Sequence, residues 1–374
     1  MTVLDARSPD TAPRTWVRPA DDPTSAPPPR RRRTGGTKAE DRALVVGAVL
    51  AGIALSWVVC FRLLPWGNPL AFALTAFAVL LAVLTVATAA TSDGPMVTDR
   101  LASAVISGGA AVVGIALVTT VGFTFVRGAG ALTHANMFFD DMAGVGPRDE
   151  LTQGGVLHAI LGSLIQIAIA VVLTVPLGIG TAVFMTEVGG GFSRVVRTVV
   201  EAMTALPSIV AGLFVYTVLI LTLGVPRSGI AAAAALSVMM LPIIARAADV
   251  VLRVVPGGLR EASLALGSSR WRTVWHVVLP TARAGLATAL ILGVARGVGE
   301  TSPVLLTSGA ASFVVLDPTA GAMNSLPLFI FSAIRSGEPL YVQRAFAAAS
   351  ILLFLVLALF VLARRIARPR TGRR

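Results

Sequence analysis

Two charged residues, Arg296 and Glu300, lie inside a long apolar stretch and are the side chains best placed to act on a ligand. A charged side chain at membrane depth costs at least about 2.5–3.5 kcal/mol, so each is expected to pair or to face water. Their spacing predicts that they share one face of a helix. A guanidinium near hydroxyl groups, such as that of Thr301, suits a tetrahedral oxyanion. The pair fits either the path or gate of an anion, or a structural contact that locks helices together.

Arg246 is a third basic residue near the end of an apolar stretch, and Asp249 follows it by three residues. Two interpretations fit Arg246. Its long side chain can reach the lipid headgroups, as arginines near the ends of membrane helices commonly do, or it can contribute to the path of an anion. Glu187 and Arg194, in contrast, are expected to be interfacial residues with no further role.

A short amphipathic segment separates two apolar stretches and is expected to form a helical hairpin. Pro256, followed by two glycines, ends the first stretch, and residues 259–266 fit about two helical turns. Gly267 suits the left-handed cap of that helix, Ser269 can cap a second short helix, and Pro280 can open the next span. The apolar residues of the segment form one stripe: Leu259, Ala262, Leu266, Val274 and Val278. Such a hairpin either docks a partner or lies along the membrane surface without one.

The hairpin resembles the EAA loop of ABC importer permeases, whose pattern is E-A-A, three residues, G, nine residues, I-x-L-P. This chain departs from the pattern only at Ser263 and Val277. The resemblance implies the fold of a type I ABC importer permease, with a core of six transmembrane helices and a loop that docks a partner ATPase. The docking residues that it implies match the pattern position by position: Glu261, Ala262, Gly267, Leu279 and Pro280.

A second segment indicates a particular group among the importer permeases. Residues 295–303 read A-R-G-V-G-E-T-S-P and are similar to the A-R-A-x-G-E-T-A-P segment of PstA-type phosphate permeases, with departures at Gly297 and Ser302. Three further stretches resemble the same family: residues 206–214, 241–246 and 254–262. The match covers roughly residues 101–366. Sister permeases of the PstC type carry a similar R-x-x-G-E-T segment, but usually with Met-Ala after the threonine.

The resemblance implies an ATP-driven importer of inorganic phosphate in which this chain is one of two permease subunits. A PstC-like permease, two PstB-like ATPases and an external phosphate-binding protein would complete the importer. The residues that would lie along the pathway or gate it are Arg296, Glu300, Thr301 and Arg246. The alternatives are a PstC-type permease, or an importer permease for another oxyanion or small solute such as sulfate or molybdate. A role in reporting phosphate status to a sensor kinase is compatible with transport.

The composition is typical of a polytopic, all-α membrane protein. Of the 374 residues, 55% are hydrophobic and 13% are charged, and apolar runs of 18 or more residues require a bilayer. Pro176 and Pro207 are expected to bend the spans that contain them. We expect about eight spans, at residues 44–62, 69–91, 101–126, 156–186, 201–224, 228–248, 281–307 and 344–363.

The net charge of +12 follows membrane topology and gives no indication of nucleic-acid binding. Arginines gather on the side of the hairpin, which the positive-inside rule places in the cytoplasm together with both termini. Residues 1–43 are expected to form a disordered basic tail and residues 44–91 two extra helices. The permease domain is expected over residues 101–366, with its coupling loop at 256–280, and a second basic tail over residues 367–374.

The sequence lacks the patterns of the common catalytic sites. It contains no G-x-x-x-x-G-K-[ST] phosphate loop, and Lys38 is its only lysine, so ATP hydrolysis is expected in a partner subunit. His134, His158 and His276 lie in different segments, and with no Cys/His cluster neither a metal nor another cofactor is expected. The polar groups inside apolar stretches are too few for an intramembrane enzyme. The chain is therefore predicted to be a non-catalytic, multi-pass subunit of the cell membrane.

Overall fold

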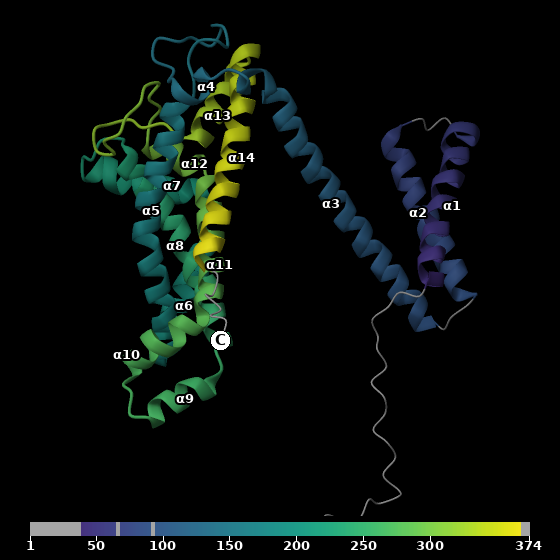
Figure 1. Ribbon diagram of the computed structural model, residues 1–374, viewed down its shortest axis with the longest axis horizontal. Helices are drawn as coiled ribbons and strands as arrows, with labels where there is room; N and C mark the ends of the chain where they lie inside the picture. Colours follow the sequence, from purple (N-terminus) through teal and green to yellow (C-terminus); the bar gives the residue numbers. More distant parts are fainter. Residues whose placement is uncertain (1–38, 65–67, 91–93, 368–374) are drawn as a thin grey trace, which may run out of the picture. The chain divides into compact units, whose positions relative to one another are not determined.

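The computed structural model describes residues 39–64, 68–90 and 94–367, and within these ranges the chain folds into helices joined by turns and loops, without a strand (Figure 1). Seven helical segments of the described residues are long and apolar enough to cross a membrane, which confirms the predicted all-α polytopic fold. Their main helices are α1 (Ala39–Val58), α2 (Pro69–Ala89), α3 (Gly94–Leu132), α5 (Leu157–Val183), α8 (Gly229–Val254), α11 (Leu279–Val298) and α14 (Pro339–Ala367).

The chain forms two compact units, Met1–Gly114 and Ile115–Arg374. The start of the permease domain that the sequence suggests, near residue 101, falls inside the continuous helix α3. In the first unit, α1 packs on α2. The absence of a side chain at Gly52 permits this approach, because a Cβ atom there would lie 3.1 Å from the carbonyl oxygen of Ala76 on α2.

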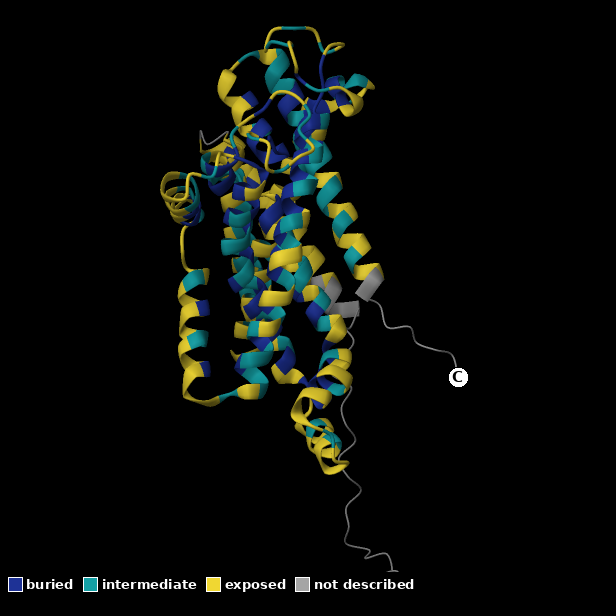
Figure 2. Cartoon of the chain, turned by 90° about the vertical axis from the view of Figure 1, so that its left-hand side faces the viewer, coloured by how far each residue is buried: buried dark blue, intermediate teal, exposed yellow. Residues whose placement is uncertain are grey.

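Helices α5, α8 and α11 form the centre of the second unit, and small residues bring them together. Neither Gly293 nor Gly297 of α11 has room for a Cβ atom, because Ile244 and Met240 of α8 fill the space. In membrane proteins, where lipid is as apolar as a side chain, such close backbone contact is a main source of helix association. The buried residues accordingly lie within the bundle, and most exposed ones lie on its outside (Figure 2).

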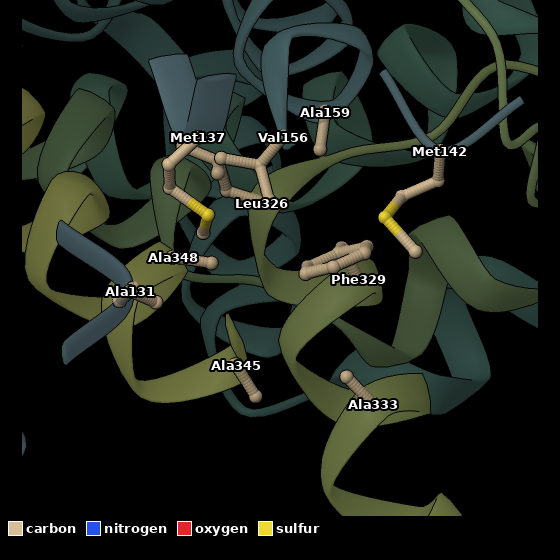
Figure 3. Close-up of a cluster of buried hydrophobic side chains, with 11 residues drawn as sticks. Ala131, Met137, Met142, Val156, Ala159, Leu326, Phe329, Ala333, Ala345 and Ala348 are labelled. Atoms are coloured by element: carbon tan, nitrogen blue, oxygen red, sulfur yellow. The ribbon is translucent and has the colours of Figure 1, made fainter. Parts of the chain in front are cut away.

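The two ends of the second unit differ in structure. One end, which we call the loop end, carries α4 (Asn136–Phe139), α13 (Leu326–Ser336) and the long loops around them (Figure 1). The opposite end carries two short helices, α9 (Gly257–Ala265) and α10 (Arg270–Thr273), and we call it the hairpin end. An apolar cluster fixes the loop end, with Met137 and Met142 packed beside Val156, Leu326 and Phe329 (Figure 3).

Arg344 of α14 is buried and holds the loop before α5. Its exposed fraction is 1%, and its Nη2 atom donates to the backbone carbonyl oxygens of Asp149, Glu150 and Gln153, at 3.0, 2.6 and 2.9 Å. A buried carbonyl that loses its donor costs free energy, so this side chain is a structural anchor of the loop end.

We therefore expect Arg344→Leu to destabilise the second unit. A hydrogen bond to a charged group contributes about 1.5–3 kcal/mol, and the substitution leaves the carbonyl oxygens of Asp149 and Gln153 without a donor, while that of Glu150 keeps the N–H of Gln153. The thermal midpoint of the purified protein in detergent measures the loss. Arg335→Leu is the matched control, because Arg335 is exposed at the end of α13. Equal midpoints for the two variants would contradict the anchoring role.

The span predicted at residues 201–224 is wrong as a single straight helix. The structure has α6 (Gly190–Thr204) and α7 (Ser208–Val215), the latter continued by the π-helical η3 (Tyr216–Thr222), and the two parts are bent by 106°. Pro207 causes the break, because it has no backbone N–H and disfavours helical geometry in the residue before it. The bend predicted at this proline is confirmed, but α6 begins before the predicted span.

Two other predicted spans differ substantially from the structure. The span predicted at residues 101–126 extends in both directions as α3, and the span predicted at residues 281–307 is divided. The predicted span 281–307 ends at Val298, and after a break at residues 299–301 a separate helix, α12 (Ser302–Thr307), follows. Pro303 lies in the first turn of α12, where its missing N–H is tolerated. Of the predicted tails, residues 1–38 and 368–374 lie outside the described residues, and residues 39–43 belong to α1.

Candidate functional site: a polar pocket and a helical hairpin

The hairpin end contains the helix–turn–helix that the sequence predicts. Helix α9 (Gly257–Ala265) is followed by Gly267 in the left-handed conformation, with φ at +82°. The hydroxyl of Ser269 caps α10 (Arg270–Thr273) by accepting from the N–H of Arg272. The arms are joined by a 2.9 Å hydrogen bond between the hydroxyls of Ser263 and Thr273. These local predictions are confirmed.

The second arm of the hairpin continues directly into a membrane span. The π-helical η4 (Val274–Val278) joins α10 to α11, so residues Arg270–Val298 form one long helical segment. Pro280 lies in the first turn of α11, as predicted, with the half-buried Leu279 before it. A push on the hairpin therefore acts on α11 through continuous helix.

The apolar stripe predicted for the hairpin divides into a buried and an exposed part. Val274 and Val278 are buried, and Val278 belongs to an apolar cluster with Ala248. Glu261 and Ala262, in contrast, are exposed. We call the exposed apolar residues of the two arms the hairpin surface: Leu259, Leu264, Leu266, Trp271 and Trp275. Exposed apolar side chains gathered beside a carboxylate are typical of a docking surface.

Arg296 and Glu300 form an ion pair, with 2.8 Å between Nε and Oε1. Their predicted placement on one helix is wrong, because α11 ends at Val298 and Glu300 lies in the break before α12. The glutamate reaches back to the last turn of α11. Its side chain is 11% exposed, whereas that of Arg296 is 57% exposed. Thr301 precedes α12, and its carbonyl oxygen accepts from Leu305 at 2.9 Å.

Arg296 lines a pocket of about 190 Å³, and it is the one charged residue among those that line it. The wall comes from the end of α6, the bend after it, α7 and α8. The other lining residues are Met203, Thr204, Leu206, Ala211, Val238, Met239 and Ile243. Glu300 faces a much smaller space beside Ser163 and Gln166 of α5. The hydroxyl of Thr204 already donates to the carbonyl oxygen of Glu201 at 2.6 Å, so the guanidinium of Arg296, with its free donors, makes this pocket a candidate anion site.

A larger groove between α5, α11 and α14 does not have this chemistry. Its volume is about 290 Å³, but every residue that lines it is apolar, from Leu164 of α5 to Ala363 of α14. An anion would lose its hydration there without gaining a hydrogen bond or a charge partner. The size of the groove is therefore no argument for an anion site.

Arg246 forms ion pairs with two carboxylates. Its Nη1 atom lies 2.9 Å from Oε1 of Glu201 on α6 and 3.7 Å from Oδ2 of Asp249. Ile243 of the pocket wall lies three residues before Arg246, which is about 4.5 Å along the helix. Thr204 of the opposite wall lies three residues after Glu201. The Arg246–Glu201 pair therefore lies at the pocket's side towards the hairpin end.

Three further ion pairs involve residues to which the sequence assigned no role in a site. Asp249, with 1% of its side chain exposed, accepts from Arg197 of α6 and from Arg253, both at 3.2 Å. Glu187 lies 2.9 Å from Arg260 of the hairpin. The interfacial interpretation of Glu187 overlooked this contact. Arg197 and Asp249, and likewise Glu187 and Arg260, are far apart in the chain. The position of Asp249 inside an apolar stretch was the one signal in the sequence that pointed to a charge partner.

The comparisons match the chain to a family and to named relatives. Residues 174–372 match the family described as binding-protein-dependent transport system inner membrane component. The chain is 41% identical over 261 residues to the phosphate transport system permease protein PstA 1 of Mycobacterium tuberculosis (strain CDC 1551 / Oshkosh), covering 70% of this chain and 85% of that protein. It is 33% identical to the phosphate transport system permease protein PstA of Pasteurella multocida (strain Pm70), covering 65% and 85%.

The solved structures include a chain of the MetNI methionine ABC transporter in an inward-facing conformation. It is similar to this chain with a TM-score of 0.46 and 23% sequence identity, covering 57% of this chain and 93% of that chain.

Proposed function

Because the chain belongs to the family of binding-protein-dependent transport system inner membrane components, we propose that it is a PstA-type permease subunit that carries inorganic phosphate into the cell. The observation that supports the proposal most strongly is the pocket in the membrane bundle that is lined by the cationic side chain of Arg296. The PstA relatives, at 41% and 33% identity, support phosphate as the anion.

Arg296 would bind the anion, and Glu300 would hold the guanidinium in place. The exposed part of Arg296 leaves donors for phosphate oxygens, while its Nε stays with the carboxylate. Arg246 would act next along the path, because its pair with Glu201 lies at the pocket's side towards the hairpin end. The membrane interior strengthens these contacts, since little water competes for the donors.

Energy would enter through the hairpin. The hairpin surface and Glu261 would dock one of two ATPase subunits, and Gly267 would shape the turn between the arms. ATP hydrolysis would thus take place in partner chains, with a PstC-like permease and an external phosphate-binding protein completing the importer. The excess of arginine near the hairpin end supports a cytoplasmic hairpin and cytoplasmic termini.

Substrate competition in a reconstituted complex tests the proposal. Proteoliposomes that contain the whole complex, with its ATPase subunits on the inside, should take up labelled phosphate. Neither sulfate nor molybdate, at roughly tenfold excess, should compete with this uptake. The physical reason is that phosphate carries its own proton donor, which an oxyanion without a proton does not offer to an acceptor along the path. Competition by sulfate would assign the chain to a permease for another oxyanion.

A further inference from the structure

Arg260 joins the hairpin to two elements of the membrane bundle. Its Nη1 and Nη2 atoms donate to the carbonyl oxygens of Val255 and Leu252, at 2.8 and 2.9 Å, at the end of α8. Its Nε atom donates to Glu187 at 3.0 Å. Glu187 belongs to the π-helical η2 (Phe184–Val188), which ends the span that begins with α5. One guanidinium thus satisfies two terminal carbonyls of α8 and one carboxylate of η2.

Arg197 of α6 joins the same two elements from another side. Its guanidinium donates to both carboxylate oxygens of Asp249 on α8, each at 3.2 Å. Its Nη2 atom also donates to the carbonyl oxygen of Met185 in η2, at 3.2 Å. Asp249 lies one helical turn before Leu252, which accepts from Arg260. Both arginines therefore form hydrogen bonds to α8 and to η2, and their contact points on α8 lie within about one helical turn of each other.

These contacts are sheltered from water. The side chains of Arg260 and Glu187 are 24% and 15% exposed, and those of Arg197 and Asp249 are 23% and 1% exposed. An exposed ion pair is easily exchanged for water, whereas a sheltered pair with several hydrogen bonds keeps its geometry. The hairpin and α6 are consequently held to one block, formed by the end of α8 and η2.

Helix α6 leads from this block to the candidate anion pocket. Met203 and Thr204 at its end line the pocket, and the 106° bend to α7 follows. We infer that Arg260 and Arg197 transmit movement of the hairpin, through the end of α8 and η2, to the pocket wall on α6. Both are positioning residues. The inference rests on the proposed function, in which an ATPase moves the hairpin.

The first test measures phosphate transported per ATP hydrolysed in proteoliposomes of the whole complex. Arg260→Gln and Glu187→Gln should each lower this ratio on the order of tenfold, the usual scale of coupling between sites, while the ATPase stays bound. The double variant should be no worse than Arg260→Gln, because that substitution already removes the contact with Glu187. Arg194→Gln, an exposed arginine on α6, is the matched control and should keep the wild-type ratio. Loss of the bound ATPase in Arg260→Gln would instead assign Arg260 to docking and overturn the inference.

The second test needs no knowledge of the substrate. Spin labels at Val199→Cys on α6 and Phe354→Cys on α14, both exposed positions, report movement of α6 in a Cys60→Ser chain. ATP should change the label distance in the complex, and Arg260→Gln should abolish the change. An unaltered change in Arg260→Gln, or none in the parent complex, would overturn the inference. If the complex moves as expected but carries no phosphate, the proposed substrate is wrong and the inference stands.

Discussion

Replacement of Arg296 by glutamine is expected to lower phosphate uptake roughly 10- to 100-fold while the complex stays assembled. A hydrogen bond from a charged donor contributes about 1.5–3 kcal/mol, and every 1.4 kcal/mol, approximately, is a factor of ten in binding. Arg296 is the one charged residue that lines the pocket, so no other side chain of the wall can replace it. Uptake of labelled phosphate measures the loss. Arg335→Gln, on the exposed end of α13, is the control and should transport normally.

A combined variant separates the binding role of Arg296 from a purely structural pair. Arg296→Gln leaves the carboxylate of Glu300, which is 11% exposed, without its ion-pair partner. Adding Glu300→Gln removes that unpaired charge and should recover any assembly that the single variant loses. If the arginine binds the anion, the double variant assembles without transporting. A double variant that assembles and transports at the wild-type rate would show that the pair only locks the helices together.

Replacement of Leu266 by aspartate is expected to release the ATPase subunit from the complex. The side chain of Leu266 is 88% exposed at the tip of the hairpin, between Glu261 and the two tryptophans of α10 and η4. A hot-spot residue of an interface contributes about 2 kcal/mol or more, which is roughly a 30-fold change in affinity, and a carboxylate here would also lose hydration on docking. Co-purification of the ATPase with the membrane subunits measures the effect. Val195→Asp introduces the same charge at an exposed position of α6 and should leave the ATPase bound.

Glu261→Ala tests the same surface without introducing a buried charge. It should weaken ATPase binding in the same direction as Leu266→Asp and leave the fold intact, because Glu261 is exposed. If both variants keep the ATPase bound at the wild-type level, the hairpin surface has another occupant. In that case the apolar side chains would lie along the membrane surface, as amphipathic helices without a protein partner do.

The hairpin was predictable because its signals are local. Pro256 ends one helix, Gly267 adopts the left-handed conformation that caps the next, and Ser269 caps α10. Each of these residues acts within a few positions of itself, so the spacing alone determines the result. Pro207 was predictable for the same reason, as a break in the helix. Its bend of 106° was not, because the direction of a chain after a break depends on packing.

The charge network could not be predicted because it depends on tertiary contacts. Glu187 and Arg260 are 73 positions apart, and Arg197 and Asp249 are 52 positions apart. No periodicity relates such residues, and each alone is typical of the end of a membrane helix. Glu300 shows a smaller failure of the same kind. The spacing between Arg296 and Glu300 suits two residues on one helix. Gly299 and Pro303, however, allow α11 to end before it reaches Glu300.

Uptake of labelled phosphate at limiting phosphate, in cells that lack this chain, tests the central claim most directly. Uptake should return when the wild-type chain is restored and stay absent with Glu261→Ala, and excess sulfate should leave the restored uptake unchanged. That result would support both phosphate transport by this chain and the docking role of Glu261 in one measurement. Uptake that is the same with and without the chain would contradict the account, because phosphate would then cross the membrane by another route.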